Sequence, residues 1–166
     1  MQKKIKLGIS SCLLGRNVRY DGGNRLDSDL LSLLGKDIEL VPICPEVEAG
    51  LSVPREPMQL VGDDACPRLI TIKTKQDRTD AFIVWVERAL PRLEQEGISG
   101  FVLKARSPSC GVHDAELVSG SGLSLGFRAG LFAAALMERF PDLTVEDSER
   151  LHDRAAREAF LARISA

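Results

Sequence analysis

The feature of this sequence that most constrains its fold is an alternation of strand-like and helix-like segments. Short apolar runs typical of strands occupy residues 4–10, 38–43, 68–74 and 99–105. Segments with helical spacing lie between and after them, at residues 26–35, 77–97, 125–141 and 153–164, and the stretch LTVEDSE predicts a last strand. Pro91 predicts a kink or a break in its helix. Strands that alternate with helices predict βαβ units. We therefore expect an α/β fold, a Rossmann-like three-layer domain with a mostly parallel sheet.

The length of the chain, 166 residues, is most economically explained by one domain. Hydrophobic residues make up 44% of it and charged residues 28%, which is typical of a soluble globular protein. The last stretch is richer in charge than what precedes it. We therefore expect a domain over residues 1–141, with residues 142–166 as a C-terminal appendage packed on that domain.

The charge balance limits the classes of partner. With 22 basic and 24 acidic residues the formal net charge is −2, which argues against a large nucleic-acid surface but not against a small anion bound by a few arginines. No apolar run is long enough to span a membrane. The first run is broken by Gly8, Ser10 and Ser11, so it predicts a strand rather than a signal peptide. We expect a cytoplasmic protein, and the sequence leaves its oligomeric state open.

Three of the four cysteines follow predicted strands. Cys12, Cys44 and Cys110 each come just after an apolar run, whereas Cys66 precedes one. In a parallel sheet the carboxyl ends of the strands share one edge, where ligands bind. We therefore expect the first three cysteines to converge there and Cys66 to lie at the opposite edge. Disulfides are not expected in a cytoplasmic protein.

Three converging thiolates favour a soft or borderline metal. A site with only three protein ligands keeps one position open for a substrate, and an iron–sulfur cluster held by three cysteines would leave one iron free. Three buried structural thiols are one alternative. His113, three residues after Cys110, would allow a structural zinc module with the cysteines, although a solvated loop histidine is the favoured interpretation. A carrier of sulfur or of an iron–sulfur cluster is a further alternative.

A basic, glycine-rich loop follows the first predicted strand. The stretch GRNVRYDGGNR contains Arg16, Arg19, Tyr20 and Arg25, and Arg55 lies in the stretch VPREP. Guanidinium groups bind phosphate through paired donors, and a tyrosine ring can stack on a pyrimidine. A polar surface loop is the alternative. The stretch SGSGLSLG, before the predicted helix at 125–141, is a weak candidate for a second anion cradle.

Three longer motifs are more specific. SSCLLGRNVRYDGGNR, VPICPEVEAGLSVPREP and LKARSPSCG, in this order, resemble the thiouracil desulfidase family over about residues 4–141. The resemblance implies a [4Fe–4S] cluster held by Cys12, Cys44 and Cys110. It also implies that the iron without a cysteine takes the sulfur of a thiocarbonyl base. The reaction would convert C=S to C=O in thiouracil or 4-thiouridine monophosphate and release sulfide.

The remaining site residues are candidates for proton transfer and substrate contacts. Water that attacks the thiocarbonyl carbon must lose a proton, and a nearby carboxylate can take it. Glu46, two residues after Cys44, is favoured for this role by the resemblance, although a solvated loop glutamate is the alternative. Ser107 is the expected catalytic helper. The expected substrate-binding residues are Ser11, Arg19, Tyr20, Arg55 and Ser109.

Overall fold

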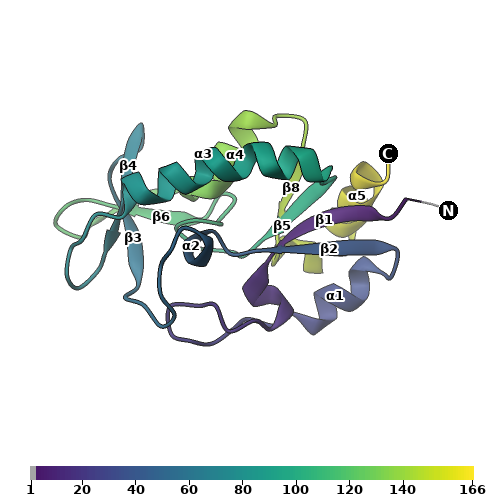
Figure 1. The fold of residues 1–166 in the computed structure, drawn as a ribbon, viewed down its shortest axis with the longest axis horizontal. Coiled ribbons are helices and arrows are strands. Elements are labelled where there is room, and N and C mark those ends of the chain that lie inside the picture. The colour runs from purple at the N-terminus through teal and green to yellow at the C-terminus, as the bar shows by residue number, and fades with distance from the viewer. Residues whose placement is uncertain (1–2) are drawn as a thin grey trace.

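A four-stranded parallel sheet forms the centre of the protein in a computed structural model, which describes residues 3–166. The strands of this sheet A run in the order β2–β1–β5–β8. Their bounds are β1 (Ile5–Ser10), β2 (Ile38–Ile43), β5 (Gly100–Leu103) and β8 (Thr144–Asp147). Every neighbouring pair is parallel. The sheet is visible in the centre of Figure 1. The predicted α/β class with a mostly parallel sheet is therefore confirmed.

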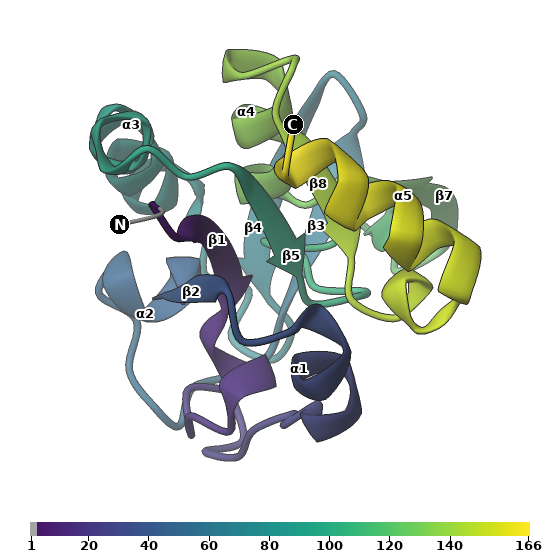
Figure 2. The same cartoon turned by 90° about the vertical axis from the view of Figure 1, so that its right-hand side faces the viewer.

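Helices cover both faces of sheet A, as Figure 2 shows. The helices are α1 (Ser28–Leu34), α2 (Pro45–Glu48), α3 (Thr79–Glu96), α4 (Leu131–Arg139) and α5 (Arg154–Ile164), with 3₁₀ turns η1 (Ser11–Leu14) and η2 (Arg150–His152). On one face, Leu30 of α1 and Phe160 of α5 pack with Leu7 and Ile9. The other face packs against α3 and α4. Among residues 3–166, no helix is long and apolar enough to cross a membrane.

The core between sheet A and the α3–α4 layer is aromatic. Phe132 of α4 lies 6.2 Å from Phe101 of β5 and 5.6 Å from Trp85 of α3, measured between ring centroids. The Phe101 ring occupies the space beside Gly8 in β1, where an added Cβ would lie 2.2 Å from Phe101 Cε1. Pro91 is exposed and does not break α3, which continues to Glu96.

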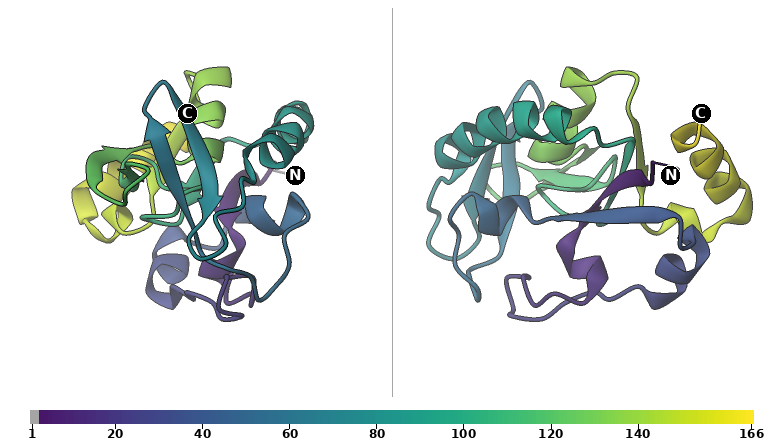
Figure 3. Two further views of the ribbon diagram at one scale, coloured as in Figure 1. Left: turned by 90° about the vertical axis from the view of Figure 1, so that its left-hand side faces the viewer. Right: turned by 45° about the vertical axis from the view of Figure 1, so that its right-hand side comes forward.

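A second sheet was not predicted. Sheet B has the order β4–β3–β6–β7, with β3 (Met58–Asp63), β4 (Cys66–Thr71), β6 (Ala115–Val118) and β7 (Ser124–Arg128). It lies at the end of the molecule away from both termini (Figures 1 and 3). The pairs β3–β4 and β6–β7 are antiparallel, and β3–β6 is parallel. The sheet packs its apolar side on α3, which buries Leu60, Leu69 and Phe82.

Sheet B corrects three local predictions. Residues 125–128 form a strand rather than the start of a helix, because Gly126 has a φ of 118° and the chain pairs with β6. Residues 58–63, assigned to no element from the sequence, form β3. Cys66 opens β4 and is exposed in a different sheet, so it does not lie at the opposite edge of the sheet that carries the other three cysteines.

The last 25 residues supply one strand of sheet A and one helix that covers it. β8 pairs with β5 along its whole length, and Phe160 and Ile164 of α5 are buried. The division of the chain at residue 141 stays a prediction.

Candidate active site

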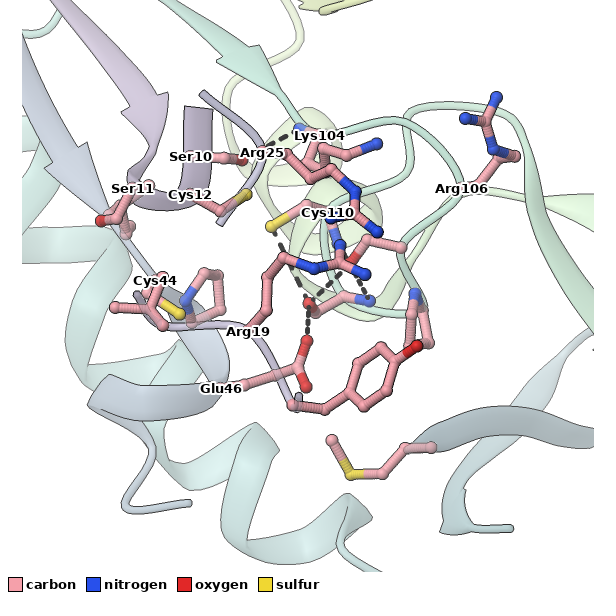
Figure 4. A pocket seen from close by; sticks show the side chains of 18 of the residues that line it. Ser10, Ser11, Cys12, Arg19, Arg25, Cys44, Glu46, Lys104, Arg106 and Cys110 are labelled. Atoms are coloured by element: carbon pink, nitrogen blue, oxygen red, sulfur yellow. Dashed lines mark hydrogen bonds between the residues drawn. The ribbon is translucent and has the colours of Figure 1, made fainter. Parts of the chain in front are cut away.

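A cavity of ≈380 Å³ opens at the carboxyl ends of β1, β2 and β5. Its walls come from the β1–η1 junction, the glycine-rich loop 15–25, the start of α2, residues 55–58, and the loop after β5. In Figure 4 the side chains of Cys12 and Cys110 are directed toward one another, and Glu46 points toward the same space. This is the edge of a parallel sheet at which ligands bind in open α/β folds.

Three thiols line this cavity. Cys12 lies in η1 directly after β1, Cys44 precedes α2, and Cys110 lies in the loop after β5. Cys12 and Cys110 are buried and Cys44 is half-buried. The three cysteines therefore converge at this edge as predicted, and each comes from the end of a different strand.

Burial raises the pKa of all three thiols. It is the largest influence on Cys12, where the charge of Lys104 partly opposes it, and on Cys44, where a backbone hydrogen bond partly opposes it. For Cys110, burial raises the pKa to about 12. With nothing bound, these thiols are therefore protonated at neutral pH, and a metal that binds them must displace protons.

Glu46 lies in the same cavity and is held at both carboxylate oxygens. Its Oε2 accepts a hydrogen bond of 2.9 Å from Ser109 Oγ, and its Oε1 lies 3.2 Å from Arg55 Nε, which donates to it. Pro45 begins α2, and the turn places the Glu46 side chain on the cavity side. The carboxylate predicted for proton transfer is therefore next to the cysteines rather than in solvent.

The two serines of the cysteine loop form a chain that ends on Glu46. Ser107 Oγ accepts backbone N–H bonds from Ser109 (3.2 Å) and Cys110 (3.0 Å). It also lies 3.0 Å from Ser109 Oγ. Because the hydroxyl hydrogen of Ser109 is used on Glu46, the hydrogen of Ser107 points to Ser109. Ser107 thus reaches Glu46 only through Ser109, which is the serine in direct contact.

The start of α4 fixes this loop. The backbone N–H of Leu131 donates to Pro108 O, and those of Phe132 and Ala133 donate to Ser109 O. A Cβ at Gly130 would lie 2.6 Å from the Ser109 carbonyl carbon, so only glycine allows this approach. The amides at this helix start are therefore occupied. The stretch SGSGLSLG forms the β6–β7 turn outside the cavity, so the anion cradle expected there is wrong.

The basic loop contributes part of the cavity wall. Arg19, Tyr20 and Arg25 line it, whereas Arg16 is exposed and lies outside it. The Arg19 guanidinium lies 5.2 Å from the centre of the Tyr20 ring. Arg19 Nε is buried without a hydrogen-bond partner in residues 3–166, and Asp21 is 3.5 Å away without forming a hydrogen bond.

The structure brings every predicted site residue to this cavity and adds others. The predicted set is Ser11, Cys12, Arg19, Tyr20, Cys44, Glu46, Arg55, Ser107, Ser109 and Cys110. Sequence reasoning missed Ser10, Lys104 and Arg106, and the apolar Val18, Ile43 and Met58. Lys104 lies near the end of the strand predicted over residues 99–105 and directly follows β5, and this position could have identified it. Met58 belongs to β3, for which no signal was found.

His113, the possible fourth zinc ligand, is exposed and does not line the cavity. Within residues 3–166, no group of three or more His, Cys, Asp or Glu side chains is spaced to hold a single metal ion. The geometry therefore does not support a zinc site formed by the three cysteines and His113.

A model of the 2-thiouracil desulfurase family matches residues 7–148 of the chain. The chain belongs to this family. The match includes all the residues that line the cavity, from Ser10 to Cys110. Membership makes the protein an enzyme of the 2-thiouracil desulfurase kind.

Two relatives extend the comparison. A solved structure of the [4Fe-4S]-dependent thiouracil desulfidase TudS superposes with a TM-score of 0.70. It is 31% identical in sequence, and the alignment covers 94% of this chain and 99% of that one. The protein YbbK of Bacillus subtilis (strain 168) is 32% identical over 108 residues, which are 62% of this chain and 71% of YbbK. The fold is therefore shared with a relative of known structure that is a [4Fe-4S]-dependent thiouracil desulfidase.

Proposed function

We propose that this protein is a [4Fe–4S]-dependent desulfidase that converts the thiocarbonyl of thiouracil or 4-thiouridine monophosphate to a carbonyl and releases sulfide. Water supplies the oxygen, sulfur leaves as sulfide, and no net electron transfer is needed. The observation that carries the proposal is the presence of three thiols and one carboxylate in a single cavity, delivered by separate strand ends of one sheet.

The donor set fits a cluster. Cys12, Cys44 and Cys110 would hold it, and three ligands leave one iron for a substrate. A cluster bound by three thiolates carries negative charge, and the cavity offers cations to balance it. The charges of Lys104 and Arg19 both act on Cys12. The buried Arg19 Nε, which has no hydrogen-bond partner within residues 3–166, can donate to an anionic sulfur.

When bound, such a cluster supplies a Lewis-acidic iron that draws electrons from the thiocarbonyl carbon through its sulfur. Glu46 is the proposed base, because attacking water must give up a proton and the Glu46 carboxylate faces the cavity. Ser109 and Ser107 can relay that proton through their hydroxyls, which are 3.0 Å apart. Arg55 Nε donates a hydrogen bond of 3.2 Å to Glu46 Oε1 and so holds this carboxylate beside the cavity.

The rest of the wall suits a pyrimidine ring with an attached anion. Tyr20 offers a face for stacking, and Val18, Ile43 and Met58 provide apolar surface. Arg25 and Lys104 make hydrogen bonds to backbone carbonyls, Asn24 O at 3.0 Å and Ala105 O at 3.2 Å. Neither bond neutralises their charge, so these two side chains can bind a phosphate. Ser11 is proposed as an additional polar contact.

The test is anaerobic purification followed by iron and sulfide analysis and addition of 4-thiouracil. About four irons per chain, a broad visible absorption, and sulfide release with formation of uracil would support the proposal. Iron without turnover on thiolated bases and nucleotides would point to a carrier. Zinc without iron, even after anaerobic reconstitution, would contradict the proposal.

A further inference from the structure

The side chain of Arg55 is one of the most restrained in the cavity wall. Only 8% of it is exposed. Its Nε donates to Glu46 Oε1, and its Nη1 donates to Ser52 O at 3.2 Å. Its backbone N–H donates to Tyr20 O at 2.8 Å. Arg55 is therefore fixed both to its own loop and to the basic loop.

Its partner Glu46 is restrained from two sides. Arg55 contacts Oε1, and Ser109, which is 1% exposed, donates to Oε2. The two donors come from different loops, one before β3 and one after β5. Two hydrogen bonds to the two oxygens of one carboxylate fix its plane as well as its position. Loss of either donor frees the side chain to rotate about its own χ angles.

The arginine is poorly placed to serve as an anion-binding residue as well. Its charge is matched by Glu46, and a substrate phosphate at the same guanidinium would bring two anions together. Leaving the Glu46 carboxylate without its partner would be costly, because only 16% of the Glu46 side chain is exposed. Arg25 is more accessible and Lys104 has no carboxylate bonded to it within residues 3–166, so an anion has better partners there.

We propose that Arg55 is a positioning residue that holds the Glu46 carboxylate in the orientation needed for proton transfer, and that it does not bind the substrate. This inference rests on the proposed function, since it takes Glu46 as the base. It assigns the arginine of the VPREP stretch to the carboxylate rather than to a phosphate.

The test compares Arg55→Gln, Arg55→Lys, Glu46→Gln and the double variant Arg55→Gln/Glu46→Gln under anaerobic conditions, with iron per chain measured in each. We expect Arg55→Gln to lower kcat on the order of 10²-fold, as misplacement of a catalytic group can do, and to leave KM and iron content within about twofold of the native values. Arg55→Lys should restore part of kcat. In the Glu46→Gln background, the additional Arg55→Gln replacement should lower kcat no further.

The opposite pattern overturns the inference. A substrate-binding arginine would raise KM about tenfold or more with kcat retained, and its effect would multiply with that of Glu46→Gln. Arg16→Gln is the matched control, because Arg16 is exposed in the basic loop outside the cavity, and it should change neither constant.

A measurement without turnover separates this inference from the proposed function. Thermal unfolding of the metal-free single and double variants gives a coupling between positions 46 and 55. If the native protein binds iron but releases no sulfide, the proposed function fails. In that case a coupling, seen as a double variant less destabilised than the sum of the singles, would still support the contact. Additive losses would overturn it.

Discussion

Cys110 and Cys66 have the same side chain but belong to two sheets that differ in strand direction. Cys110 lies at the carboxyl edge of sheet A, buried among two other thiols and a carboxylate. Cys66 opens β4 of sheet B and is exposed. In sheet A every strand runs the same way, so the residues that follow its strands gather at one edge. In sheet B two of the three pairs are antiparallel, so the strand ends are divided between two edges.

The comparison explains why residues far apart in sequence can be assigned to one site. Parallel strand direction supplies convergence without any local motif such as a pair of closely spaced cysteines. Sheet B contributes mainly packing surface and one cavity residue from its strands, Met58. Changes at the edge of sheet A should therefore affect chemistry, and similar changes at sheet B should not.

Replacement of the cysteines should give the largest contrast. Cys12→Ser, Cys44→Ser or Cys110→Ser should each reduce bound iron and lower sulfide release, by more than the roughly 10–100-fold that loss of an outer-shell partner costs. Cys66→Ser should retain both, because Cys66 lies outside the cavity. Iron analysis and sulfide assays after anaerobic reconstitution measure this. Equal losses in all four variants would contradict the division between the two sheets.

A second contrast compares two glutamates, each held by hydrogen bonds. Glu46→Gln should lower kcat by about 10²–10⁴-fold, because a general base is lost while the shape is kept. Glu56, which instead accepts hydrogen bonds from Thr74 beyond the end of β4, is the matched control, and Glu56→Gln should retain kcat. Steady-state kinetics with 4-thiouracil decide the matter. A Glu46→Gln variant with native kcat would exclude Glu46 as the base.

The parallel half of the fold could be predicted from sequence because its signals are local. Apolar runs such as 38–43 and the cysteines after them identify strands and their carboxyl ends. In sheet B the strand at 68–74 was predicted, but β3 and β7 were not, because each contains a glycine with positive φ, Gly62 and Gly126. Its pairing also depends on partners distant in sequence, as for β3 with β6.

The candidate site divides in the same way. Its cysteines and Glu46 follow strand ends and could be located from sequence. The contact between Ser109 and Glu46 could not be predicted, because it joins residues from different segments. It also depends on the hydrogen bonds by which the start of α4 holds the cysteine loop. Arg55 was located in the wall, but its pairing with Glu46 was not foreseen, since a loop arginine gives no sign of its partner.

A smaller effect concerns stability rather than activity. Gly8→Ala should destabilise the protein by about 1–3 kcal/mol, because the new Cβ would meet the Phe101 ring in the core behind sheet A. Gly120→Ala, in the β6–β7 turn of sheet B, has nothing within 4 Å and should leave the free energy of unfolding nearly unchanged. Chemical denaturation of both variants tests this. A native-like Gly8→Ala variant would mean that Phe101 can move aside at little cost.

The smallest effect is expected at the rim of sheet A, where Arg106 binds Glu149 through two hydrogen bonds of 2.7 and 2.5 Å. The hydrogen bonds from Arg106 lower the pKa of Glu149 from its ordinary value of 4.5. A lowered carboxyl pKa contributes stability above that ordinary value and loses it as pH falls through the folded-state pKa. Both side chains are more than half exposed, so Arg106→Gln should cost less than about 1 kcal/mol at neutral pH. The difference from the native protein should shrink as the pH falls below 4.5, which denaturation of the metal-free forms at several pH values would measure. A difference that instead grows toward low pH would mean that Arg106 stabilises the loop through something other than the Glu149 charge.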